Sequence, residues 1–287
     1  ASTSLTFTTR RGATGDGEVD VVDIRLHGSA ASVKGPVNLL GGLQVDGTLA
    51  TLTLDDVAAT RGITVGGTGV ALNATFDQVI DTSLLSLAPV KSLKASLWRN
   101  TDGSADTISA PVLGAISITG ECGASWVATG ADSKGVAVSS LKVGRGEGMS
   151  VVAAAGGVSS LQVKSGHWAG GGLACLWSGA VSVSGDLTDN TWSITQALAG
   201  LTVKGAARTS TIRAGGNVGA VKLGAAVGVD LLAGVAADAA HHAQDIADFV
   251  STVAIKSVSV SGLSAGASVM QNCNFSAAAI GACTITT

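Results

Sequence analysis

The chain has 287 residues, including 40 Gly, 3 Pro, 4 Cys and no Tyr, and its 17 basic and 20 acidic residues give a formal net charge of -3. Only 13% of the residues are charged, so the chain lacks the strongly basic character expected of a nucleic-acid-binding protein. Disorder is excluded because 46% of the residues are hydrophobic. No uninterrupted apolar run reaches about 18 residues, so we expect no transmembrane helix.

The N-terminal segment begins with a strand-like pattern and continues into a polar, Gly-rich stretch. Leu5 and Phe7 alternate with threonines, which is typical of a β-strand. In the stretch that follows, Asp16, Glu18 and Asp20 could supply oxygen ligands to Ca²⁺. Their spacing is not that of a known calcium loop, so turn carboxylates are the simpler interpretation.

Short strands are then indicated throughout the chain by apolar, polar, apolar triplets followed by Gly or a small polar residue. The earlier copies are irregularly spaced: Leu43–Val45, Leu52–Leu54, Ile63–Val65 and Leu113–Ile118. Between the last two, Asp102 and Asp106 flank a Gly-Ser turn and are a second candidate pair of Ca²⁺ ligands. We otherwise expect no cofactor.

Residues 138–224 repeat strictly. The first apolar residue of the triplet lies at Leu141, Leu161, Val181, Leu201 and Val221, a constant period of 20. A second apolar position follows about half a repeat later, at Val152, Trp192, Ile212 and Leu232. Each repeat therefore contains at least two strands.

A 20-residue coil cannot bury its own apolar side, but coils stacked about 4.8 Å apart share one continuous core. The period therefore predicts an all-β fold, a right-handed parallel β-helix with coils of about 20 residues. The known bias of parallel crossovers sets the hand. The triplet positions should form inward columns, with Lys142, Gln162, Ser182, Thr202 and Lys222 facing outward. An antiparallel β-sandwich is the alternative, but it has no reason to keep a strict 20-residue period.

This interpretation divides the chain into an N-terminal arm or cap, residues 1–38, and a solenoid, residues 39–287. The solenoid is interrupted by an insertion at 234–250, where apolar residues at helical spacing predict one short helix over 235–250.

The predicted helix carries two acid–histidine pairs at i, i+4 spacing, Asp238 with His242 and His241 with Asp245. Such pairs could bind a metal ion, but most pairs of this kind are solvated surface. We expect no metal site here.

The two ends of the chain are candidate assembly sites. The last repeat, from Ile280 to Ile285, is followed by no polar cap, and the unpaired strand edges of a solenoid attract partners. The arm with Leu5 and Phe7 could add to a neighbouring copy as an extra strand, or cap its own solenoid. A head-to-tail contact between copies would build a filament or homopolymer.

Tryptophans and cysteines leave further alternatives open. Trp168 and Trp177 lie in Gly-rich corner segments, where exposed rings could stack on glycans, whereas Trp192 is expected in the core. Cys273 and Cys283 could form a disulfide in an oxidising compartment, or remain free thiols.

The units from about residue 113 onward, such as Leu201–Gly224, resemble the right-handed parallel β-helix repeats of large bacterial surface and adhesin-like proteins. The resemblance implies an architecture and an extracellular location, and it carries no functional residues. The first residue is Ala1 rather than Met, which is what a secreted chain looks like after its signal peptide is removed.

Three functions follow as hypotheses. The first is an extracellular structural protein, a self-associating subunit of a surface filament, sheath or layer. The second is a cell-surface adhesin domain that binds glycans through Trp. The third, a polysaccharide lyase or hydrolase, requires carboxylates at equivalent positions of neighbouring coils. Because Glu147, Asp186, Asp189 and Asp230 lie at different phases of the repeat, we expect no enzyme.

Overall fold

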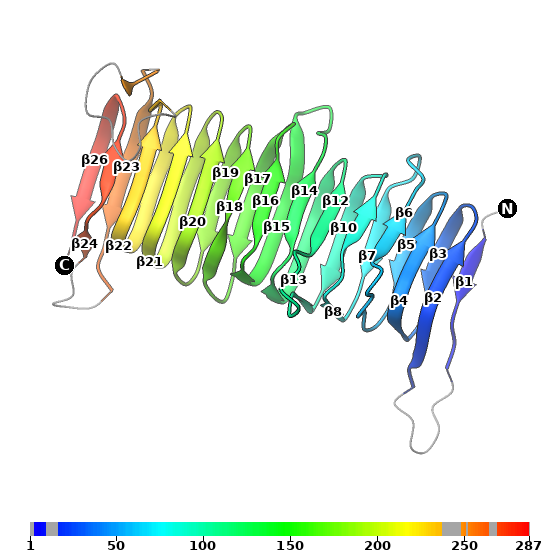
Figure 1. Cartoon of the computed structure of the whole chain (residues 1–287). Coiled ribbons are helices and arrows are strands. Elements are labelled where there is room, and N and C mark those ends of the chain that lie inside the picture. Colours follow the sequence, from blue (N-terminus) through cyan, green and yellow to red (C-terminus); the bar gives the residue numbers. More distant parts are fainter. Residues whose placement is uncertain (1–2, 10–16, 237–247, 251, 264–268, 287) are drawn as a thin grey trace. The chain divides into compact units, whose positions relative to one another are not determined.

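The computed structural model describes residues 3–9, 17–236, 248–250, 252–263 and 269–286. These residues form a parallel β-solenoid of about 11 coils with coils of about 20 residues, as predicted, and they contain no α-helix (Figure 1). The described residues also contain no helix with the length and apolarity needed to span a lipid bilayer.

The predicted helix over 235–250 falls mainly outside the described residues, and so do its candidate ligands Asp238, His241, His242 and Asp245. What is described is where this insertion leaves and rejoins the solenoid. Val235 and Phe249 form an antiparallel bridge, and the backbone N–H of Ala236 donates to the carbonyl of Asp248 at 2.7 Å.

The chain divides into two compact units, residues 1–143 and 144–287, and β15 contains the boundary. The strands of unit 1 are β1 (Ser4–Thr6), β2 (Val19–Leu26), β3 (Ala30–Lys34), β4 (Val37–Val45), β5 (Leu49–Thr53), β6 (Ile63–Val65), β7 (Leu72–Thr75), β8 (Gln78–Ile80), β9 (Leu84–Ser86), β10 (Val90–Ala95), β11 (Leu97–Arg99), β12 (Thr107–Ala110), β13 (Leu113–Cys122), β14 (Ser125–Ala128) and most of β15 (Val136–Glu147).

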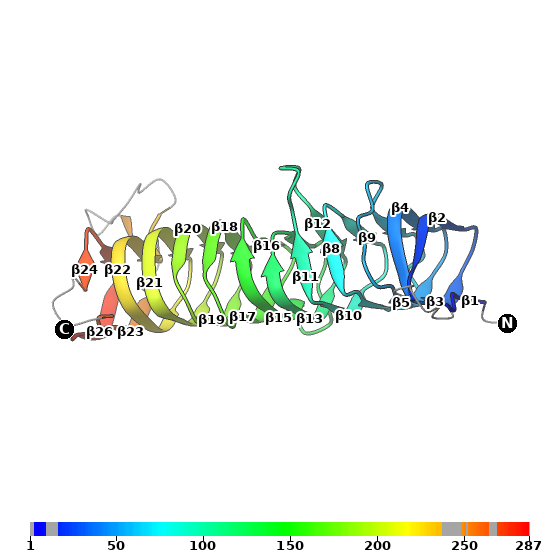
Figure 2. The same ribbon diagram turned by 90° about the horizontal axis from the view of Figure 1, so that it is seen from below.

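The strands of unit 2 are β16 (Ser150–Ala153), β17 (Gly157–Val163), β18 (Trp168–Cys175), β19 (Ser178–Val183), β20 (Leu187–Ile194), β21 (Leu198–Ala214), β22 (Val218–Ala233), β23 (Ala254–Val260), β24 (Met270–Gln271), β25 (Asn274–Ser276) and β26 (Ala279–Ile285). Every long strand of both units pairs in parallel with the strand one coil away, as Figure 2 shows from below. The long strands β21 and β22 bend around corners and contribute to more than one side of a coil.

One side of the coils is called sheet 1 below. In unit 1 it is built from β1, β3, β5, β7, β10 and the first parts of β13 and β15. In unit 2 it is built from β17, β19, β23, β26 and the first parts of β21 and β22.

The predicted inward column is confirmed in sheet 1 of unit 2. Leu161 pairs with Val181, Val181 with Leu201, and Leu201 with Val221, and all four side chains are buried. The column continues beyond the insertion, since Val221 pairs with Val258. The insertion therefore leaves the register of the sheet intact.

The second predicted column is correct at Trp192 and Ile212, which pair with each other, but wrong at Val152. Val151 is the buried residue there, while Val152 faces outward and is 37% exposed. Leu232 is buried but pairs with Arg213, and it is Leu231 that pairs with Ile212. The corners differ in length from coil to coil. Counting a fixed number of residues from sheet 1 can therefore end one residue away from the buried position, on its outward-facing neighbour.

The core of unit 2 contains the stacked rings of Trp168 and Trp192, whose centroids lie 5.4 Å apart. Both side chains are completely buried, and the indole N–H of Trp168 donates to the carbonyl of Met149 at 2.9 Å. Two indoles from neighbouring coils thus contact each other in a core that otherwise contains mainly Leu, Ile, Val and Ala.

Replacing Trp192 with Ala should lower the free energy of unfolding of unit 2 by about 3–5 kcal/mol, because the cavity cannot be refilled by the small side chains around it. Val152→Ala removes an outward-facing side chain and is the matched control, with an expected loss under about 1 kcal/mol. Urea unfolding followed by far-UV circular dichroism measures both. Equal losses in the two variants would contradict the assignment of Trp192 to the core.

Candidate functional site

The N-terminal strand β1 lies in sheet 1 of its own chain. Leu5 pairs in parallel with Val33, and the backbone N–H of Phe7 donates to the carbonyl of Lys34 at 2.8 Å. Both Leu5 and Phe7 are half-buried. The described residues place no strand on the outer edge of β1. Of the two predicted roles, capping its own solenoid is the one that the structure shows.

The last strand, β26, pairs with β23 on one edge, and no described residue pairs with its other edge. Ile280 and Ile285 continue the inward columns of Ile255 and Val260, yet they are 39% and 50% exposed. Their exposure follows from their position, since no described coil covers them. Among the described residues, this edge therefore combines unpaired backbone groups with an exposed apolar row.

The four cysteines are free thiols in the structure. Burial raises the pKa of both Cys122 and Cys175 to about 12, which makes them unreactive at neutral pH. Cys273 donates to the carbonyl of Gln271 at 3.2 Å, and Cys283 is exposed on β26. The open alternative of a Cys273–Cys283 disulfide is not what the structure contains.

An acidic cluster in unit 1 contains more residues than the sequence indicated. Oxygens of Asp55, Asp56 and Asp77 all lie within 4.8 Å of one another, and this spacing suits a hard cation such as Ca²⁺. Two of the predicted ligands lie nearby: the amide of Asn38 donates to Glu18 at 3.0 Å and to Asp20 at 3.1 Å. The third, Asp16, lies outside the described residues.

The three aspartates were missed because each follows a strand in a turn, where carboxylates are common. A signal was present, since Asp55 and Asp77 are separated by 22 residues, the same spacing as Leu52 and Ala74, which pair one coil apart. Aligning the irregular coils by their triplets would have found them.

Burial raises the pKa of Asp55, and the charges of Glu18, Asp56 and Asp77 add to this effect. Asp55→Asn should therefore raise the melting temperature at neutral pH by about 1–3 °C, and the gain should shrink in high salt. Asp46→Asn is the matched control. His27 and Gln44 lower the pKa of Asp46, so removing the charge of Asp46 should not raise the melting temperature. Differential scanning calorimetry measures the melting temperatures of both variants. Equal shifts in the two would contradict charge repulsion within the acidic cluster.

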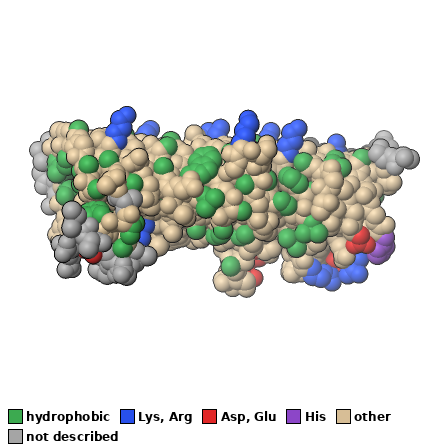
Figure 3. Space-filling view, turned by 90° about the horizontal axis from the view of Figure 1, so that it is seen from above, with side chains coloured by type: hydrophobic (Ala, Val, Ile, Leu, Met, Phe, Trp, Pro, Cys, Tyr) green, Lys and Arg blue, Asp and Glu red, His purple; other side chains and the backbone are tan. Residues whose placement is uncertain are grey.

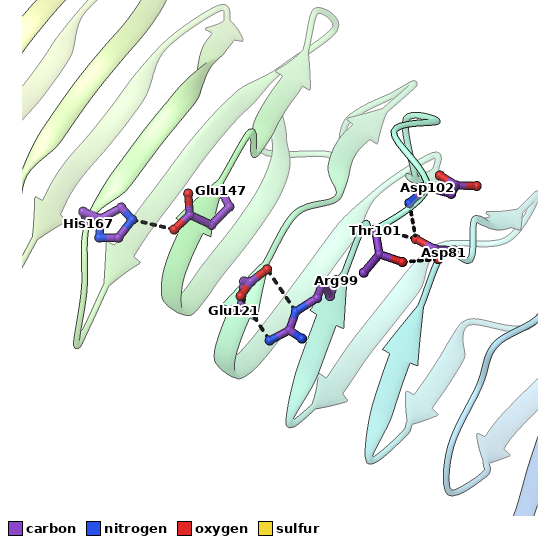
Figure 4. Close-up of polar contacts among 7 residues, drawn as sticks. All are labelled: Asp81, Arg99, Thr101, Asp102, Glu121, Glu147 and His167. Atoms are coloured by element: carbon purple, nitrogen blue, oxygen red, sulfur yellow. Dashed lines mark hydrogen bonds and ion pairs between the residues drawn. The ribbon is translucent and has the colours of Figure 1, made fainter.

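The second predicted Ca²⁺ pair separates in the structure. Asp102 is exposed and accepts from the backbone N–H of Ser104 at 2.7 Å, whereas Asp106 is buried. Asp81 orders the turn between them, accepting from the backbone N–H of Thr101 at 2.5 Å and from its hydroxyl at 2.6 Å (Figure 4). Asp102 and Asp106 therefore do not present their oxygens to one ion.

Burial, helped by the charges of Asp81 and Asp102, raises the pKa of Asp106 from 3.8 to about 6. One of its oxygens has no hydrogen-bond partner among the described residues. The folded chain thus binds this proton more tightly than the unfolded chain does. Its stabilising contribution is complete below about pH 4, and it is lost as the pH rises to about 6.

Asp106→Asn should remove this loss, because the amide stays neutral at every pH. We expect the variant to melt higher than the parent chain at pH 8 and at nearly the same temperature at pH 4, where both side chains are neutral. Melting curves across this range measure the difference. A constant difference between the two chains would exclude titration of Asp106 as its cause.

Two further charged contacts join successive coils within a unit (Figure 4). In unit 1, the guanidinium of Arg99 contacts the carboxylate of Glu121 through two nitrogens at 3.2 and 3.3 Å. In unit 2, His167 Nε2 lies 2.5 Å from Glu147 Oε1. Each pair joins side chains about one coil apart and so connects two neighbouring coils.

A shallow hollow lies over the first coils of unit 1, lined among others by Asp23, Arg25, Gln44, Arg61 and Thr64. Arg61 forms an ion pair with Asp23 across it. Figure 3 shows basic, acidic and His side chains gathered over these coils. The lining contains two arginines and one aspartate, and Asp23 already pairs with Arg61, so little charge is left for a ligand.

The predicted exposure of Trp168 is wrong, because its side chain is 0% exposed and belongs to the core. Its corner brings the ring inward, where it stacks on Trp192. Trp177 is half-buried, and its ring lies against the backbone of Gly157 one coil away, where a Cβ would come within 2.0 Å of it. The two residues therefore do not form a joint glycan platform.

No known protein family matches the chain, and no curated protein or solved structure is significantly similar to it.

Proposed function

We propose that the chain is a non-enzymatic, extracellular structural protein whose copies join head to tail through sheet 1. Strand β1 of one copy adds in parallel to the open edge of β26 of another, and repetition gives a filament, sheath or layer. The observation that carries this proposal is the edge of β26 with which no described residue pairs, where Ile280 and Ile285 are exposed.

The two strands suit each other in direction and pattern. Both belong to sheet 1 and both run parallel to their neighbours, so β1 added to β26 continues the same ladder. Leu5 extends an inward column at Val33, as Cys283 does at Val258. In a joined pair Leu5 would cover Cys283, and both would belong to one continuous core.

The driving force is burial of apolar side chains together with pairing of free backbone groups. Complete burial of an exposed Ile is worth about 1.5–3 kcal/mol, and Ile280 and Ile285 are each partly exposed. One strand alone does not overcome the entropy of association. The remaining sides of the last coil, β24 and β25, must therefore also contact the neighbouring copy.

The carboxylates of unit 2 support a structural role, since they serve local contacts. Asp186 accepts from the backbone N–H of Ala206 at 2.8 Å, and Asp230 accepts from the amide of Asn274 at 2.6 Å. Glu147 pairs with His167, and Asp189 occupies a corner with φ of 52°. None of these contacts pairs one carboxylate with another.

Electron microscopy and sedimentation of the purified 287-residue chain test the proposal. We expect filaments from the parent chain and monomers from the double variant Ile280→Lys/Ile285→Lys, because charges on an edge strand block its pairing. Both residues are already exposed, so the monomer should keep its fold. Val152→Lys places one lysine on an outward-facing position inside unit 2 and should leave the filaments intact.

Cys283 provides a second measurement. It is exposed on β26 in the monomer and would be covered by Leu5 in the filament, so its alkylation should slow at least about tenfold on assembly. A Cys273→Ser background restricts the label to Cys283, since the other two thiols are buried and unreactive. A parent chain that remains monomeric at high concentration, with Cys283 reactive throughout, would overturn the proposal.

A further inference from the structure

The outward side of sheet 1 in unit 2 carries positive charge only. Its strands contain no Asp or Glu: β17, β19, β23, β26 and the paired first parts of β21 and β22. Four lysines lie in these strands or directly after them, and all four are exposed: Lys164, Lys204, Lys222 and Lys256. They are called the lysine face. The whole chain is slightly acidic, so this is a segregation of charge and not an overall excess.

The lysines of this face have no carboxylate partner among the described residues. The ion pairs of the described chain involve His or Arg and never Lys. The nearby carboxylates of unit 2 are held in other contacts, as in the pairing of Glu147 with His167. The lysine face therefore keeps its charge available for an external partner.

The surface between the lysines is rich in hydroxyl groups. Lys222 lies between Thr202 and Ser259 on the two neighbouring strands. At Gly179 and Gly219 the backbone of the next coil is so near that a Cβ would come within 1.9 Å and 1.8 Å of a carbonyl oxygen. Larger side chains cannot stand there, so an extended polymer can lie directly on the sheet.

Two of the lysines share a column of sheet 1, and Lys222 lies two residues away from that column. Lys164 and Lys204 follow equivalent positions of sheet 1 two coils apart, which is about 9.6 Å. Lys222 lies one coil beyond Lys204. In the left half of Figure 3, Lys and Arg side chains stand out along one edge of the view. A partner with many negative charges along an extended chain fits lysines spread over several coils better than a single small anion does.

We infer that the lysine face binds an acidic polysaccharide, a polymer whose sugars carry carboxylate or sulfate groups. The ammonium groups pair with the acidic groups, and the Ser and Thr hydroxyls bond to the sugar hydroxyls. The strands of the face contain no aromatic residue for stacking on nucleic acid bases, and Trp177, directly before β19, is half-buried against Gly157. Its outward residues also include no large apolar side chain that could enter a lipid surface.

Sheet 1 of unit 1 follows the same rule. Its strands β3, β5, β7 and β10 contain Lys34, Lys91 and Lys94 but no Asp or Glu, and all three lysines are exposed. The charge segregation is therefore a property of sheet 1 in both units, and each unit offers its own cationic face.

Binding of the full chain to immobilised alginate, a polymer of uronic acids, tests this inference, with neutral dextran as the uncharged reference. We expect binding to alginate only, falling steeply between about 50 mM and about 300 mM salt because ion release drives it. The double variant Lys204→Gln/Lys222→Gln should bind about tenfold or more weakly, since each cation near an anionic surface contributes about fivefold.

Lys134→Gln/Arg208→Gln is the matched control, because it removes the same charge from exposed residues outside sheet 1. It should weaken binding less than about threefold. Equal losses in the two double variants, or no binding to alginate at about 50 mM salt, would overturn the inference. Tighter binding to single-stranded DNA or to phosphatidylserine vesicles than to alginate would overturn it as well and identify the other class of partner.

Discussion

The parallel backbone ladder of sheet 1 is the constraint on which the rest of the structure depends. Each coil can bury its apolar side chains only when the coil beside it repeats the same alternation in the same register. The unbroken pairing from Leu161 to Val221, and on to Val258, shows how strictly this is kept. The corners of different length and the insertion after β22 lie between the paired strands of sheet 1.

The same ladder separates apolar side chains from charged ones. Inward positions are occupied by aliphatic side chains and indoles, and outward positions of sheet 1 by lysines and small residues. Carboxylates collect elsewhere, as with Asp55, Asp56 and Asp77, where the register is relaxed. The proposed assembly and the proposed polysaccharide contact use different parts of one sheet, its edge and its outward side. Neither hinders the other.

Much of the fold could be predicted because a short motif that recurs at a constant spacing shows which residues of successive coils lie next to each other. Leu141 to Val221 specify the column in sheet 1 by spacing alone. The prediction failed where corners set the geometry: Val152 faces outward because its corner differs by one residue, and Trp168 turns inward. The acidic cluster was missed because its members come from irregular coils. The lysine face appears only when every strand of sheet 1 is aligned.

The junction between Gly234 and Val250 has a consequence for how such a chain can change over evolution. The N–H of Val250 donates to the carbonyl of Gly234 at 2.8 Å, so the two ends of the insertion meet. Val221 pairs with Val258 in the register of the other coils. The pairing of sheet 1 therefore does not depend on the length or sequence of the segment inserted between these two strands. This junction is a natural grafting point, where a foreign loop or a whole domain can be displayed without repacking the scaffold.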